Sequence, residues 1–462
     1  MNKRRIITIT AIALAVTVAV GLLIARLRKR PVTQLEDAKT VYMNAADASK
    51  GIHSYVLDIA QTHQIGAQGK TYTENADIIL SCVGFGADNM RVSKEEVLTN
   101  GKHKTELSEI FSNGTLYTAI NDACFSSLIA SADYTQTMVP IVLLDYSLYH
   151  SFSGVDSGEE YVIHIADPTA PEKWAYSEGM TFVGASGTAY ISYEGKLTKS
   201  VYILEYTKEN VSHRVTYISQ LTEKTPEVTV PENANNYTPI QYLEGLKMLE
   251  RASGLLTQID NIRAVSKETT FFEAFGDTRT KTVVLETKKD IDWSAKVETE
   301  TTLSNASRPD QDSVYTQTET FKLGIYEQEM TGIPIVQNLD ITEEEMQTYC
   351  LNLLVSTIML PKDILQCQKE ENNGVIRITY SASKDFTRQI SQNACDTLYQ
   401  NPDLLTELAE NNIMDEMFAY LELDSGTGLP LASGIYYSST YSAEGLPYQF
   451  RYEADQTYQI AN

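Results

Sequence analysis

The chain repeats itself, loosely, in two halves of about 200 residues, and this repetition limits what it can fold into. Residues 35–39 open the first half and residues 243–247 open the second, and each stretch predicts a helix of three to four turns. A series of segments that alternate apolar and polar residues follows each helix, and such alternation is typical of β-strands. Two copies of one helix-and-strand unit are therefore expected.

The predicted strands correspond between the two halves. Tyr117 matches Tyr326, and Ile163 matches Ile376. The offset between the halves is about 207 residues at first and then grows, because the helical middle of the second half is longer. The matched stretches are residues 55–61 with 262–269, 69–73 with 276–280, 90–100 with 295–305, 160–165 with 375–380, and 190–193 with 420–423.

The alternation within these strands indicates antiparallel sheets with one face in water. Ile376, Ile378 and Tyr380 lie on one side of their predicted strand, whereas Arg377 and Thr379 lie on the other. A half-buried sheet of this kind needs helices or a second sheet to cover its apolar face. Helices are predicted before the first strand and in the middle of each half, so we expect them to supply this cover.

Residues 6–25 form an apolar run of 20 residues, and about 20 residues are needed for a helix to cross a bilayer. Basic residues flank the run on both sides, and no small-residue cleavage site follows it, which favours an uncleaved anchor over a signal peptide. The flanking charges nearly balance, so they leave the orientation open. The Tyr-rich, strand-rich remainder favours a body outside the cell. We therefore predict a single-pass protein of the cell membrane with an extracytoplasmic body.

The predicted fold class is α+β, with an N-terminal transmembrane helix and two tandem antiparallel-sheet half-barrels packed on helices. A Pro-containing, apolar-poor stretch separates the two repeats and is expected to be a linker. The predicted boundaries are a cytoplasmic tail at 1–5, a transmembrane helix at 6–25, a juxtamembrane linker at 26–34, a first half-barrel at 35–224, a linker at 225–240 and a second half-barrel at 241–462.

The charge balance excludes one class of partner. After the seven basic residues of the first 30, the chain carries 30 basic and 61 acidic side chains. A body this acidic repels the phosphates of nucleic acids, so we expect no nucleic-acid partner. The five cysteines show no CxxC spacing, and either free thiols or one bridge among Cys350, Cys367 and Cys395 fits their positions.

No motif for catalysis, for a cofactor or for a metal stands out. All six histidines lie in the first half without metal-ligand spacing, and they are expected to be surface residues. Residues 66–71 resemble a phosphate loop only faintly and fit a hairpin turn better, since they join two predicted strands. Residues 381–384 fit an SxxK pattern without its companion motifs. We predict no catalytic residue, no cofactor and no metal.

The order of elements resembles that of the LolA/LppX-type lipoprotein-carrier fold, an unclosed β-barrel curled around helices. The stretches that carry the resemblance are the openings at Leu35 and Leu243 and the closing runs at residues 190–197 and 420–430. This resemblance implies a cavity for a lipid or a lipoprotein, or alternatively a signalling module. It assigns no binding residue, because no motif is shared, and a lipid-modified cysteine is absent from the N-terminal segment.

Two functional hypotheses follow for the expected envelope protein, and both are non-catalytic. In the first, each half-barrel holds a lipid chain or another apolar ligand. In the second, the protein is a structural or sensory module whose sheets contact another envelope protein or the cell wall. An enzyme is the least favoured reading. For the first hypothesis, the cavity walls of the second half are predicted where a strand face meets a helical stripe: Ile376, Ile378, Leu353, Leu354 and Ile358.

Overall fold

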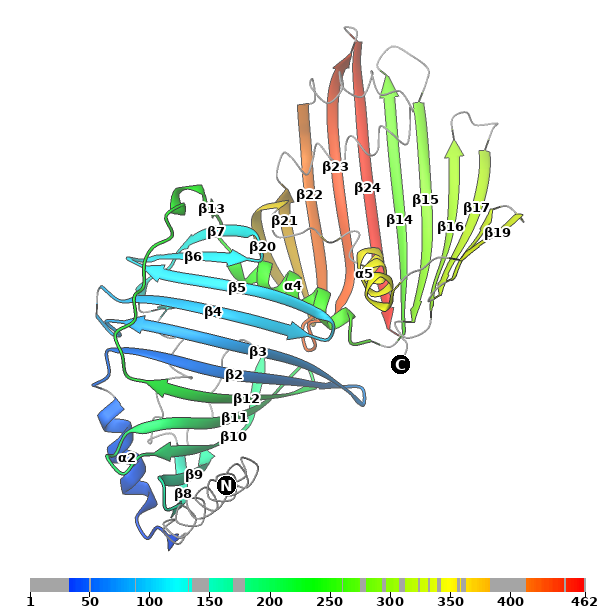
Figure 1. Cartoon of the computed structure of the whole chain (residues 1–462). Helices are drawn as coiled ribbons and strands as arrows, with labels where there is room; N and C mark the ends of the chain where they lie inside the picture. The colour runs from blue at the N-terminus through cyan, green and yellow to red at the C-terminus, as the bar shows by residue number, and fades with distance from the viewer. Residues whose placement is uncertain are drawn as a thin grey trace, which may run out of the picture.

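Two large antiparallel β-sheets dominate the structure, a computed structural model of the whole chain (Figure 1). In Figure 1 the strands of the first sheet run across the picture, whereas those of the second run up it. The described residues are 33–49, 51–87, 89–131, 133–134, 149–168, 179–259, 261–274, 280–292, 296–306, 312–322, 325–330, 333–338, 342–354, 358, 363–382, 413–443 and 446–460.

The first sheet has 13 strands in the order β1-β8-β9-β10-β11-β12-β2-β3-β4-β5-β6-β7-β13. All neighbours are antiparallel except β13, which lies parallel to β7. The strands are β1 (Thr33–Gln34), β2 (Ser54–Ala67), β3 (Lys70–Val83), β4 (Arg91–Asn100), β5 (His103–Ser112), β6 (Thr115–Ile120), β7 (Ala123–Leu128), β8 (Tyr149–Asp156), β9 (Tyr161–Pro168), β10 (Met180–Ile191), β11 (Leu197–Lys208), β12 (Val211–Thr222) and β13 (Thr238–Pro239).

The second sheet has 11 strands in the order β19-β18-β17-β16-β15-β14-β24-β23-β22-β21-β20. The strands are β14 (Asn261–Ala274), β15 (Thr280–Asp292), β16 (Lys296–Ala306), β17 (Asp312–Lys322), β18 (Ile325–Met330), β19 (Ile333–Asn338), β20 (Ile364–Asn372), β21 (Val375–Ala382), β22 (Ile413–Asp424), β23 (Pro430–Ala443) and β24 (Leu446–Ile460).

Both sheets follow the same path through space. A meander of six strands is followed by a meander of five, whose last strand returns to pair with the first strand of the six: β12 with β2, and β24 with β14. Tyr117 and Tyr326 lie on the corresponding strands β6 and β18, and Ile163 and Ile376 lie on β9 and β21. We propose that the sheets are two copies of one unit. The domain boundaries at 35–224 and 241–462 stay a prediction.

Two-residue turns explain why the strands form meanders. Gln68 and Gly69 between β2 and β3 have φ angles of 52° and 79°, and Asn373 and Gly374 between β20 and β21 have φ angles of 52° and 78°. Left-handed backbone at both turn positions matches the twist of antiparallel strands. Residues 66–71 thus form a hairpin turn, and the faint likeness to a phosphate loop has no structural counterpart.

Three α-helices are bounded in the described part of the chain: α2 (Ala38–Ser49), α4 (Leu243–Leu256) and α5 (Glu343–Leu354). The first, α2, packs on β8, β10 and β11 at one end of the first sheet. The second, α4, lies between the sheets and contacts β4 and β5 of the first and β20 of the second (Figure 1). The third, α5, hydrogen-bonds to β24 through the Leu354 carbonyl oxygen.

The stretch expected to be a linker is attached to the first sheet. Its segment Thr238–Pro239 is β13, Ala234–Asn236 forms the short 3₁₀ helix η3, and the Val228 side chain is buried. Arg91 donates a hydrogen bond to the Val228 carbonyl oxygen at 3.0 Å. One continuous apolar core then runs from the first sheet through α4 into the second.

The prediction of half-barrels packed on helices is wrong. The sheets are large and open, and the described helices are too short to fill them. A helix of 12 to 14 residues is about 18–21 Å long, whereas eleven strands extend about 50 Å across a sheet. Each helix therefore covers only a few strands, which alternation along the sequence could not reveal.

The predictions of a single-pass membrane protein and of a cell-membrane location are also contradicted. Among the described residues, no helix is both long enough and apolar enough to cross a membrane. The expected span at residues 6–25 lies outside the described residues.

Candidate functional site

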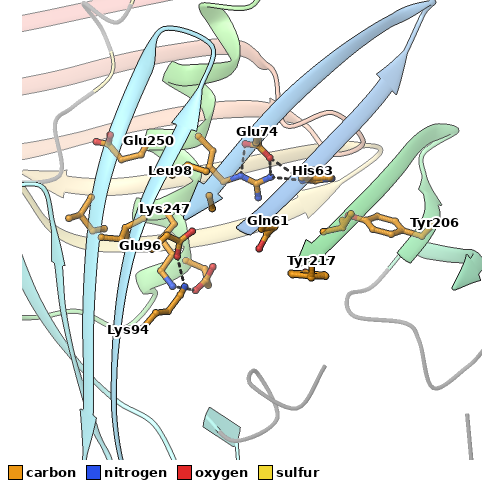
Figure 2. Close-up of a pocket in the computed structure, with 16 residues that line it drawn as sticks. Gln61, His63, Glu74, Lys94, Glu96, Leu98, Tyr206, Tyr217, Lys247 and Glu250 are labelled. Atoms are coloured by element: carbon orange, nitrogen blue, oxygen red, sulfur yellow. Dashed lines mark hydrogen bonds and ion pairs between the residues drawn. The ribbon is translucent and has the colours of Figure 1, made fainter. Parts of the chain in front are cut away.

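A cavity of about 320 Å³ lies between α4 and the face of the first sheet that it covers (Figure 2). Strands from both meanders of the first sheet contribute to it, because β12 pairs with β2 and so brings the two meanders together. The lining residues are Gln61, His63, Glu74, Ala76, Lys94, Glu96, Leu98, Leu107, Ile120, Tyr206, Val215, Tyr217, Glu244, Lys247, Glu250 and Arg251.

The apolar part of this lining consists of side chains that alternate inward along their strands. All of them are buried, which fits the alternating burial of β3 and β5. They come from five different strands of the sheet and form an apolar wall next to the charged groups of α4. These residues are Ala76, Leu98, Leu107, Ile120 and Val215.

The first group of charges surrounds Glu74, which is only 3% exposed. Arg251 on α4 donates to Oε1 of Glu74 at 2.9 Å and contacts Oε2 as well, and Asn100 donates to Oε1 at 3.0 Å. His63, the cross-strand neighbour of Glu74, places Nδ1 3.0 Å from Oε2. Burial alone would raise the pKa of Glu74, but Arg251 and His63 outweigh it and lower this pKa to about 2.

The second group lies around Glu109, a buried residue of β5. Lys247 on α4 lies 2.7 Å from Oε1 of Glu109 and 2.9 Å from Glu244. Lys94 on β4 contacts Glu109 and also Glu96, and Figure 2 shows its contact with Glu96. Burial would raise the pKa of Glu109, but the two lysines lower it. The groups around Glu74 and Glu109, which form the charged rim of the cavity, therefore hold cations and anions in direct contact, with these two carboxylates ionised.

A second, smaller cavity of about 150 Å³ lies where the two sheets and α4 meet. It shares His63, Tyr206 and Arg251 with the larger one. The first sheet also supplies Ile65, Met180, Lys208 and His213, α4 supplies Met248 and Leu255, and the second sheet with its β22–β23 turn supplies Ile376, Leu423, Ser425, Gly426, Thr427 and Gly428.

The two cavities are linked by a chain of hydrogen-bonded rings. His63 Nε2 lies 3.0 Å from His213 Nδ1, and the His213 ring stacks on Tyr206 with centroids 4.6 Å apart. Burial, followed by the proximity of His63, lowers the pKa of His213 to about 4. His213 is therefore neutral at pH 7.

The geometry does not match a Ser-His-acid triad, although Ser425 and His213 line one cavity with Glu74 behind His63. A nucleophile and its base are expected within hydrogen-bonding distance. No hydrogen bond joins Ser425 Oγ to His213 Nε2. In the described part of the chain, no group of three or more His, Cys, Asp or Glu residues is arranged to hold a metal ion.

The predicted cavity walls lie in different places. Ile376 lines the smaller cavity. Ile378, Leu354 and Ile358 are buried in the continuous core. Leu353 belongs to α5, but its side chain lies outside the described residues. The role of these five residues as a ligand cavity stays a prediction.

Sequence reasoning missed the charged residues that line both cavities. His63 and His213 were expected at the surface, yet they are 8% and 6% exposed. A signal was present, because Glu74 stands between Tyr72 and Ala76 on the apolar face of its strand. The β2–β3 turn also sets the register that pairs His63 with Glu74. Arg251 could not be found this way, because its position depends on how α4 packs.

No family model matches the chain, and no curated protein matches it. Among solved structures, LprF from Mycobacterium bovis aligns at 13% identity and a TM-score of 0.25, over 43% of this chain and 98% of its own. A putative AttH from Nitrosomonas europaea aligns at 6% identity and a TM-score of 0.15, over 87% and 92% of the two chains. At these TM-scores the similarities carry no argument about function.

Proposed function

We propose that this protein is a non-catalytic binding module that holds a small amphipathic molecule in the larger cavity. The observation that carries the proposal is the cavity itself, about 320 Å³ in volume, with a buried apolar wall beside a rim of paired charges. Ligand sites in proteins are commonly concave and about 300–1,000 Å³ in volume, with a few well-placed polar groups that orient the ligand.

The ionisation and hydrogen bonding of the charged rim residues favour binding over catalysis. A general acid or base works best with a pKa near the working pH. The pKa of Glu74 is instead lowered to about 2, and its carboxylate is already held by Arg251, Asn100 and His63. Such a group stays ionised and fixed, which suits orientation of a ligand better than proton transfer.

The rim also indicates the kind of head group. Its lining includes four carboxylates and three cations, each close to a charge of opposite sign or to a hydrogen-bond donor (Figure 2). A zwitterionic or uncharged head group fits this arrangement, and a lipid chain or a similar apolar tail fits the wall of Leu98, Leu107 and Ile120.

Binding of dodecyl lysophosphatidylcholine to the full chain tests the proposal. Titration calorimetry is expected to show saturable binding, and Leu107→Trp should abolish it by filling the cavity. The matched control is Ile79→Trp, because Ile79 lies on β3 of the same sheet and its side chain is 48% exposed. Equal binding by both variants, or no binding by the unmodified chain, would contradict the proposal.

The alternative function, a protein-interaction module, is supported by one feature of the second sheet. In the described part of the chain, β19 forms an outer edge of that sheet. A free edge can accept a strand from another protein, although Pro334 within β19 limits such pairing. Native mass spectrometry separates the two functions, since a co-purifying small molecule supports the first and a stoichiometric protein complex supports the second.

A further inference from the structure

Two buried polar atoms without a hydrogen-bond partner belong to residues that line the smaller cavity. His213 Nε2 belongs to the first sheet and Ser425 Oγ to the second, and both residues are more than nine-tenths buried. The Gly426 backbone lies close enough to the His213 ring to favour its charged form, but it forms no hydrogen bond with Nε2. Buried polar groups normally have partners, so two such atoms in one cavity point to a ligand.

Hydrogen bonds assign the proton positions on the two histidines. The ionised Glu74 carboxylate lies 3.0 Å from His63 Nδ1, so this nitrogen carries a proton and donates it. Arg251 Nη2 is farther from that nitrogen, at 3.3 Å, and directs a hydrogen to Glu74 instead. When His63 is neutral in this tautomer, its Nε2 accepts from His213 Nδ1–H at 3.0 Å, which leaves His213 Nε2 as an acceptor without a proton.

The two charged side chains that line the cavity are both cations. Lys208 and Arg251 line it together with the two histidines, and none of its lining residues is acidic. The partners of the two cations, Glu371 at 3.3 Å from Lys208 and Glu74 beside Arg251, are not part of the lining. An anionic group inside the cavity would therefore meet a positive wall.

Apolar side chains form most of the remaining wall, and the volume of the cavity limits the size of the ligand. A cavity of about 150 Å³ holds a molecule the size of benzene, or ~6–8 non-hydrogen atoms. The apolar side chains of the wall are Ile65, Met180, Met248, Leu255, Ile376 and Leu423.

We propose that the smaller cavity is a second binding site, specific for a small monocarboxylate with a short apolar tail. The carboxylate lies between His213 and Ser425, and the tail packs against the Met and Leu side chains of α4 and the second sheet. Ser425 Oγ–H donates to one carboxylate oxygen. One proton is taken up from solvent and lies between the other oxygen and His213 Nε2.

The site is pre-formed on the second sheet. The Ser425 N–H donates to the Gly374 carbonyl oxygen at 2.8 Å, and Asp424 accepts 2.7 Å hydrogen bonds from the N–H and hydroxyl of Thr427. These bonds fix the β22–β23 turn next to Lys208. A bound carboxylate would therefore connect the two sheets directly.

Titration calorimetry with hexanoate on the full chain tests this proposal. Saturable binding is expected, with uptake of about one proton per hexanoate at pH 7, measured by comparing two buffers of different ionisation enthalpy. The groups facing His213 are His63 on β2, Tyr206 and Lys208 on β11 and Arg251 on α4, with Glu74 and Glu371 behind them. Hexylamine should not bind; equal binding of hexylamine, or hexanoate binding without proton uptake, would overturn the proposal.

Variants locate the site. Ser425→Ala and His213→Phe should each weaken hexanoate binding at least tenfold, whereas His164→Phe, an exposed histidine of β9, should leave it unchanged. Leu107→Trp should abolish lysophosphatidylcholine binding but spare hexanoate. If Leu107→Trp removes hexanoate binding while Ser425→Ala does not, the carboxylate lies in the larger cavity and this proposal fails on its own. If only lysophosphatidylcholine fails to bind, the function proposed for the larger cavity fails instead.

Discussion

The helices α2 and α4 begin corresponding halves of the chain, yet they pack in different ways. Tyr42 and the two buried alanines of α2 pack into a small apolar cluster with strands of their own sheet. The second helix, α4, buries Leu246 and Leu249 in the core but presents Lys247 and Arg251 to carboxylates of the other sheet. Both cavities lie along α4.

This difference shows how a duplicated unit can acquire a site. A helix that covers its own sheet needs only an apolar stripe, and the resulting contact is closed, meaning that it leaves no cavity. A helix that joins two sheets meets two surfaces, and gaps remain where those surfaces diverge. In this chain the gaps are lined by the ion pairs that hold α4 in place. The predictions that follow test whether the two contacts differ in this way.

Tyr42→Ala in α2 should give the largest loss of stability. Tyr42 is 1% exposed and lies 5.5 Å from the Phe152 ring, and truncation of a buried aromatic side chain costs about 3–5 kcal/mol. The loss, measured by guanidinium unfolding, should be the same at pH 7 and pH 4, since the surrounding cluster is apolar. Tyr193→Ala, at an exposed tyrosine, is the control; a strongly pH-dependent loss would break the comparison.

Glu74→Gln should weaken the α4 contact in a pH-dependent manner. Because the pKa of Glu74 is lowered from 4.5 to about 2 in the folded state, its charge stabilises the fold above about pH 4.5. This contribution, about 3 kcal/mol, is lost as the pH falls through 2. The difference in unfolding free energy between the unmodified chain and the variant should therefore shrink on acidification.

The control for that titration is Glu106→Gln on β5, whose carboxylate lies at the surface and pairs with Lys104. This variant should hardly change the dependence of stability on pH, since exposed ion pairs contribute little. A constant difference between Glu74→Gln and the unmodified chain from pH 7 to pH 2 would show that the charge of Glu74 does not hold α4.

Gly254→Ala in α4 should lower the stability of the fold by less than the two substitutions above. Gly51→Ala, its counterpart after α2, should not lower it. Alanine favours a helix by about 1 kcal/mol, but a Cβ at Gly254 would lie 2.6 Å from the Asn100 Cβ, and overpacking costs about 1–3 kcal/mol. A net loss of about 1 kcal/mol is expected. Gly51, after α2, has only the Ala48 carbonyl oxygen nearby, at 3.5 Å, so Gly51→Ala should be neutral or stabilising.

Much of the strand pattern could be predicted from the sequence, because alternation and turn residues act locally. The hairpin at Gln68 and Gly69 and the inward side of β21 are examples. The openness of the sheets could not be predicted, since it depends on how many strands pair and on how little of the sheet a short helix covers. The placement of α4 on the first sheet was equally hidden, because the repeat suggested that each helix covers its own strands.

The candidate site was less accessible to prediction than the fold. Ile376 was selected because it alternates inward, and this alternation does not distinguish a cavity wall from a packed core. The charged residues were passed over because polar side chains are usually exposed. The positions of Glu74 and His63 on apolar strand faces carried a signal, but Arg251 becomes their partner only through contacts between elements far apart in the sequence.

The smallest effect on stability is expected for Ile376→Trp, and it separates a cavity from a filled core on one strand. Ile376 and Ile378 lie on the same face of β21, and both are buried, but only Ile376 lines the smaller cavity, next to Met248 and Leu255 of α4. Tight packing gives no space for a larger side chain. Ile378→Trp should therefore cost about 1–3 kcal/mol through overpacking, whereas Ile376→Trp should cost less than about 1 kcal/mol because the indole enters the cavity.

Hexanoate binding should be lost in Ile376→Trp and kept in Ile378→Trp at temperatures where both are folded. Equal destabilisation by the two substitutions, measured by guanidinium unfolding, would mean that the α4 contact is as closed as that of α2.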